Sequence, residues 1–170
     1  MAEIVDILSL IEAEWHEPRF SKTEATSLSS LRMQCTLYRG SPITSQRHLR
    51  PSLPDDLIDL WSLINNAILF EDIDYGQWGL KVLSPKEAIE ATGDFMQNRP
   101  KEYSIGDLII GTFVGDQDLL LVRCDRGAPD FGQMLVVLPL DQREDWWNAA
   151  NTLSEMLSKY VTNEGSKYWE

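Results

Sequence analysis

The residues with the clearest capacity for chemistry lie between Gly106 and Asp125, where three glycines and four aspartates surround two apolar runs, GDLIIGTFVGDQDLLLVRCD. Gly106 and Gly111 have the spacing of a phosphate-binding loop, but the lysine that such a loop requires is absent. Asp116 and Asp118 begin like a calcium loop, but three leucines follow where oxygen ligands or glycine are needed. The stretch therefore predicts neither a phosphate site nor a calcium site.

Other residue types that often serve catalysis or metal binding are few. Cys35 and Cys124 have no CxxC spacing, and neither His16 nor His48 has a second ligand at metal-site spacing. We expect two reduced, partly buried thiols and no metal or cofactor. An enzyme would have to act through carboxylates alone, and no motif selects which ones. The sequence therefore favours a protein that is not an enzyme.

The charge of the chain favours a basic partner. Its formal charge is -12, which opposes binding to nucleic acid or to an anionic membrane. Six acids fall within twenty residues that contain no lysine or arginine: Asp55, Asp56, Asp59, Glu71, Asp72 and Asp74. The longest apolar run is too short to span a bilayer, and the start of the chain lacks a positively charged signal. We expect a cytoplasmic protein.

The elements that must position these residues follow from apolar periodicity. Helical stripes are expected from Ile4 to Trp15, from Pro54 to a stop at Asn65–Asn66, from a capping box at Ser84 to about Met96, and from Asp141 to Tyr160. Trp15, Trp61 and Trp146 are expected in the core. Strands are expected at residues 31–37, 78–83, 108–114, 119–124 and 134–138, with GDQD as a tight turn, and a loop is expected at residues 40–52. Continuous apolar runs indicate that parts of the sheet are covered on both faces.

The order of four segments resembles the SUKH superfamily of bacterial toxin-immunity proteins and the yeast cell-wall assembly regulator. These segments are LPDDLIDLWSLINNA, GLKVLSPKEAIE, GDLIIGTFVGDQDLLLVRCD and WWNAANTLSEMLSKY, and the resemblance covers about residues 53–161. The family usually has Asn-Gly where this chain has Asn65-Asn66. The resemblance implies an α+β fold, with a mainly antiparallel sheet of about four to six strands flanked by helices, and a function in binding without catalytic residues.

These considerations predict one globular domain in three parts: an N-terminal helix with a strand and loop extension over residues 1–52, a SUKH-like core over residues 53–162, and a tail over residues 163–170. The leading hypothesis is an immunity protein that neutralises a cognate toxin, a nuclease or another basic domain, by direct contact. The expected contact residues are exposed acids with one aromatic neighbour, namely Glu71, Asp72, Asp74, Tyr75, Asp116 and Asp118.

Two other hypotheses belong to different classes. One is a regulatory or scaffold module that binds several cellular proteins and has no toxin. The other is a carboxylate-based hydrolase, which would need acids clustered in a concave pocket. The sequence leaves the oligomeric state and the identity of the partner open.

Overall fold

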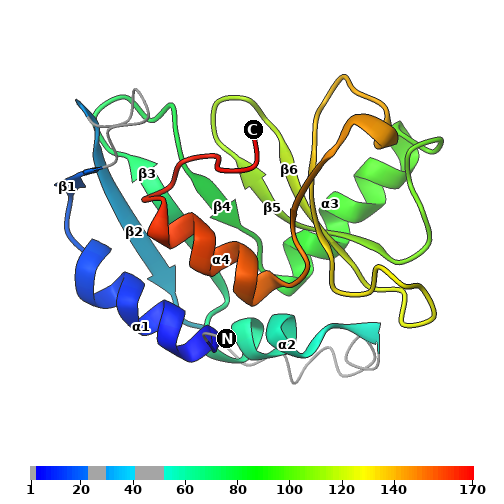
Figure 1. The fold of residues 1–170 in the computed structure, drawn as a ribbon, viewed down its shortest axis with the longest axis horizontal. Coiled ribbons are helices and arrows are strands. Elements are labelled where there is room, and N and C mark those ends of the chain that lie inside the picture. Colours follow the sequence, from blue (N-terminus) through cyan, green and yellow to red (C-terminus); the bar gives the residue numbers. More distant parts are fainter. Residues whose placement is uncertain (1–2, 23–29, 41–51) are drawn as a thin grey trace.

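The computed structural model describes residues 3–22, 30–40 and 52–170, which form an α+β fold around one antiparallel sheet (Figure 1). The predicted class is confirmed, but the sheet has eight strands instead of four to six. The strands are β1 (Arg19–Phe20), β2 (Arg32–Tyr38), β3 (Asn66–Asp72), β4 (Leu80–Val82), β5 (Asp107–Phe113), β6 (Leu119–Arg123), β7 (Met134–Val137) and β8 (Trp147–Ala150). The helices are α1 (Ile4–Trp15), α2 (Asp55–Leu63), α3 (Pro85–Asn98) and α4 (Leu153–Thr162). Most of the loop predicted before Leu53 lies outside the described residues.

The strands lie in the sheet in the order in which they follow one another along the chain, from β1 to β8. Every neighbouring pair is antiparallel. The predicted hairpin of β5 and β6 is confirmed, as is its extension by β7. Because strand direction alternates, successive connections lie at opposite ends of the sheet.

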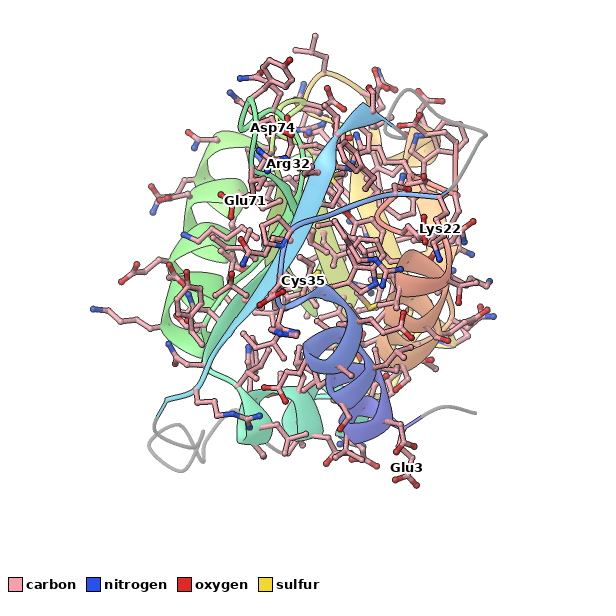
Figure 2. All side chains as sticks on the ribbon, turned by 90° about the vertical axis from the view of Figure 1, so that its left-hand side faces the viewer. Glu3, Lys22, Arg32, Cys35, Glu71 and Asp74 are labelled. Carbon is pink, nitrogen blue, oxygen red and sulfur yellow. The ribbon has the colours of Figure 1, made fainter. Side chains whose placement is uncertain are left out.

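Helices cover both faces of this sheet. Helices α1, α2 and α4 contact one another, whereas α3 contacts β5. Figure 2 shows α3 on one side of the sheet and α1 and α4 on the other. Because helices cover both faces of the sheet, neighbouring strand residues such as Ile109 and Ile110 are both fully buried, which explains the continuous apolar runs. The described part of the chain contains no helix of the length and apolarity that crossing a bilayer requires.

Residues 3–22 and 30–40, the described part of the chain before position 52, belong to the same core. The predicted stripe of α1 is buried, and the predicted strand at residues 31–37 is β2, which pairs with β3. Trp15 of α1 lies edge-on against Phe70 of β3, with 4.8 Å between ring centroids. The N-terminal extension therefore contributes both a strand and a helix to the central fold.

Two predictions of secondary structure are wrong. Helix α2 ends at Leu63, and Asn66, which was expected to belong to the helix stop, is the first residue of the unpredicted strand β3. The helix predicted from Asp141 begins only at Leu153, where Thr152 accepts a hydrogen bond from the N–H of Glu155. Residues 147–150 instead form β8, because pairing with β7 satisfies their backbone and still buries Ala149 and Ala150.

The other local predictions agree closely with the structure. Ser84 and Glu87 form the capping box of α3, with both reciprocal hydrogen bonds present. Helix α2 begins at Asp55 after an N-cap at Pro54, one residue later than predicted. Trp15, Trp61 and Trp146 are buried as expected. Cys35 is a buried free thiol and Cys124 a partly buried one.

Candidate functional site

The two loops that hold the predicted contact residues lie side by side at one end of the sheet (Figure 1). The N–H of Val114, after β5, donates a 2.8 Å hydrogen bond to the carbonyl of Gly79, before β4. Gly115 has a φ of 97°, and a Cβ atom there would lie 2.6 Å from the carbonyl oxygen of Gln77. Glycine is therefore needed for the two loops to meet. We call residues 71–79 and 114–118, together with Arg32 and Lys167, the turn end.

Arg32 of β2 neutralises one of the predicted acids. Its Nη2 lies 2.5 Å from Oδ1 of Asp74, and its backbone N–H also donates to the same carboxylate. Figure 2 shows the two side chains directed toward each other next to Glu71. The hydrogen bond from Arg32 holds the pKa of Asp74 below its ordinary value. Asp74 therefore carries a negative charge, but the positive charge of Arg32 partly cancels its electrostatic effect on a partner.

Asp72 and Asp118 are buried, so the expectation that they are exposed is wrong. Asp72 is 1% exposed, and its carboxylate accepts hydrogen bonds from the backbone N–H groups of Asp74, Tyr75 and Gln77. These bonds form the β3–β4 turn, a local role that aspartate often has. Asp118 is 4% exposed and accepts from Lys167.

Lys167 follows α4 in the chain and forms ion pairs with the β5–β6 turn. Its ammonium group lies 2.5 Å from Oδ2 of Asp116 and 2.7 Å from Oδ2 of Asp118, and its side chain is 5% exposed. The rings of Trp78 and Phe113 are 5.7 and 5.5 Å from the nitrogen. Burial by itself lowers the pKa of Lys167, but the hydrogen bonds that Lys167 donates to both aspartates raise the pKa by more, so the net pKa is raised.

The turn end keeps an excess of negative charge after this pairing. It contains five acids (Glu71, Asp72, Asp74, Asp116 and Asp118) and two bases, Arg32 and Lys167, which leaves a formal charge of -3. The side chain of Asp116 is 60% exposed, and Tyr75 is 74% exposed. The turn end therefore presents an acidic surface with a protruding aromatic ring.

The other half of the predicted acidic cluster lies elsewhere. Asp55, Asp56 and Asp59 belong to α2, at the opposite end of the sheet from the turn end (Figure 1). Asp56 accepts a hydrogen bond from the N–H of Ser154, at the start of α4. Asp59 lines a pocket of about 280 Å³ together with Glu3 of the α1 N-cap. No pattern in the sequence indicated that Glu3 and Asp59 lie close together, because 56 positions separate them.

A larger pocket, of about 530 Å³, lies at the start of β5. Its walls are mainly apolar and come from α2, α3 and the segments before β5 and after β6, and Cys124, Asp107 and Asp125 also line it. Asp107 accepts from Arg123 and Arg143, and Asp125 accepts from the N–H of Gly127. Both carboxylates thus have structural partners, and the pocket suits an apolar group better than acid–base chemistry.

We expect Cys124 to react slowly with alkylating agents, although it lines this pocket. Burial raises its pKa to about 12, from an ordinary value of 9.0. At pH 8 this lowers the thiolate fraction about 1000-fold relative to an unperturbed thiol. The check is the rate of iodoacetamide labelling, followed by mass spectrometry in folded and in guanidinium-unfolded protein. Cys124→Ser identifies the labelled site, and folded-state labelling as fast as in unfolded protein would refute the prediction.

Comparison with known proteins does not identify the chain. No protein-family model matches it, and no curated protein matches its sequence. Within residues 3–22, 30–40 and 52–170, no group of three or more His, Cys, Asp or Glu residues is placed to hold a metal ion. The site is therefore characterised by its geometry and charge, and the resemblance to the SUKH superfamily stays a prediction.

Proposed function

We propose that this chain is an immunity protein that binds a basic toxin domain through the turn end and blocks it without turnover. The observation that carries the proposal is the surplus of carboxylates at the turn end, in a chain whose total charge is -12. Glu71, which is half-buried although it was expected to be exposed, and the exposed Asp116 supply charge there. Tyr75 supplies an exposed aromatic side chain of the kind that often anchors protein interfaces.

A nuclease domain has the properties that such a surface would recognise. Its substrate-binding surface must be basic, because it attracts a polyanion. An acidic protein that covers this surface gains fast, electrostatically steered association. The resemblance of residues 53–161 to SUKH immunity proteins supports the same function. An immunity protein of this kind would act in the cytoplasm of the cell that it protects.

The experiment starts with affinity capture of partners by the purified chain in the host that encodes it. Each captured protein is then expressed alone and together with the chain, and cell survival is measured. A partner that kills cells, and that an equimolar amount of the chain renders harmless, supports the proposal. If no captured partner is toxic, immunity is refuted, and several non-toxic partners would favour the regulatory or scaffold module.

The location of the contact surface is tested by charge neutralisation. We expect Glu71→Gln with Asp116→Asn to slow association with the toxin about three- to tenfold at low salt, with little effect at high salt. The matched control is Glu90→Gln with Asp94→Asn, which removes two exposed acids from α3. Stopped-flow association rates at two salt concentrations measure the effect. Equal rates for both double variants would place the interface elsewhere.

A further inference from the structure

The site around Lys167 is built to recognise a primary ammonium group. Asp116 and Asp118 accept its hydrogen bonds at 2.5 and 2.7 Å, and the rings of Trp78 and Phe113 lie within cation–π distance. Charge, hydrogen bonding and the aromatic faces all select a cation over a neutral group. Asp116 is largely exposed, so one side of the site is open to solvent.

The segment that supplies Lys167, residues 163–170, differs from the rest of the core. It contains no helix or strand, and it leaves α4 through two residues with positive φ, Glu164 at 51° and Gly165 at 83°. Trp169 packs against Phe113 and Tyr160. However, the Oγ of Ser166 and the Nε1 of Trp169 are buried without a hydrogen-bond partner in the described part of the chain.

These unsatisfied groups weaken the docking of the segment. A buried donor or acceptor that loses water without gaining a partner opposes burial, so part of the aromatic contact energy is cancelled. The backbone hydrogen bonds of the segment are local, among them those from Gly165 to Tyr160 and from Ser166 to Asn163, both 2.9 Å. Two side-chain hydrogen bonds also attach it to the core: Nε1 of Trp78 donates to the carbonyl of Gly165 at 2.8 Å, and the hydroxyl of Tyr168 donates to the carbonyl of Ala149 at 2.9 Å. None of these bonds joins two strands, so the segment can open without breaking the hydrogen bonds of the sheet.

We propose that this ammonium site receives a lysine side chain of the protein partner, and that Lys167 occupies the site only in the free protein. The inference rests on the proposed function, because it names the group of the basic partner that the turn end recognises. A basic partner suits the site better than a second copy of this chain, since two chains of charge -12 repel each other.

In the free protein Lys167 competes with any added lysine. The apparent affinity for an external lysine therefore falls in proportion to the fraction of molecules whose site is open. Removing the charge of Lys167 should unmask the site. Lys167→Met is the appropriate variant, because methionine keeps an unbranched apolar stem against Trp78 and Phe113.

The probe is the peptide acetyl-Gly-Gly-Lys-Gly-Gly-amide, and its control carries norleucine in place of lysine. We expect Lys167→Met to bind the lysine peptide about tenfold more tightly than wild type does, measured by tryptophan fluorescence titration. The norleucine peptide should not bind, and adding Asp118→Asn to the variant should abolish binding. Equal affinities of wild type and Lys167→Met, or no binding by a folded variant, would overturn the proposal.

Hydrogen exchange of wild type tests the opening even if the variant does not fold. We expect the amides of Gly165 and Ser166 to exchange about 100-fold faster than those of the buried strand β6. Exchange at the same rate would show that the segment opens only with global unfolding, and would overturn the proposal. A dimer formed by exchange of the segment, detected by sedimentation equilibrium, would replace the partner with a second copy.

The outcomes also separate this inference from the proposed function. The peptide and exchange measurements need no toxin, so they stand if no toxic partner is found. Conversely, protection from a toxin by a chain whose Lys167→Met variant ignores the lysine peptide would retain the immunity function and reject the ammonium site.

Discussion

Replacing Asp107 with alanine is expected to lower the free energy of unfolding by about 3–5 kcal/mol, a large part of the stability of a typical domain. The side chain of Asp107 is 0% exposed and lies 2.6 Å from Arg123 and 2.7 Å from Arg143. It also accepts a hydrogen bond from the N–H of Ser104. Without this carboxylate, Asp130 is the one ionic partner left to the buried guanidinium of Arg123 among the described residues.

Urea unfolding monitored by tryptophan fluorescence measures this effect. Asp94→Ala is the control, because Asp94 is exposed on α3 and forms no ion pair within the described residues; its effect should stay within about 0.5 kcal/mol. The loss of unfolding free energy for Asp107→Asn should lie between the losses for these two variants, since asparagine keeps one acceptor for Arg123. A loss below about 1 kcal/mol for Asp107→Ala would show that solvent compensates the two arginines.

Trp15→Ala should be similarly disruptive, with a loss of about 3–5 kcal/mol. Trp15 is buried and packs on Phe70, which in turn lies 5.3 Å from the ring of Tyr160. These three rings join α1, β3 and α4, so the substitution opens a cavity where three elements meet. The effect is expected because the α1 helix belongs to the common core.

The control on the same helix is Leu10→Ala, because Leu10 is exposed and its loss should cost about 0.5 kcal/mol or less. Calorimetric unfolding of Trp15→Ala should show one cooperative transition at a lower temperature. Two separate transitions, or an unchanged midpoint, would contradict a single core and would support an N-terminal part that folds independently.

Much of the fold could be predicted because its signals are local. The stripe of α1, the capping box at Ser84 and the β5–β6 turn each depend on residues within a few positions of one another. Trp146 was also assigned correctly to the core, although the element expected to carry it was wrong.

The elements that sequence analysis missed depend on pairing with distant strands. Residues 147–150 have apolar spacing that also fits a helix, and only β7 makes the extended conformation favourable. Strand β3 is a short run between asparagines and acids, and its pairing with β2 and β4 decides its structure. The spacing of apolar residues alone cannot show whether such a short segment forms a helix or a strand.

The candidate site divides in the same way. The sequence by itself determined the negative charge, the absence of a phosphate or calcium motif between Gly106 and Asp125, and the loops in which Asp74 and Asp116 lie. Only the tertiary structure decided that Asp72 and Asp118 are buried and that Lys167 lies between two aspartates. The physical reason is that charge is a property of composition. Whether a carboxylate faces water, a backbone N–H group or a lysine 49 residues away depends on how the chain folds back on itself.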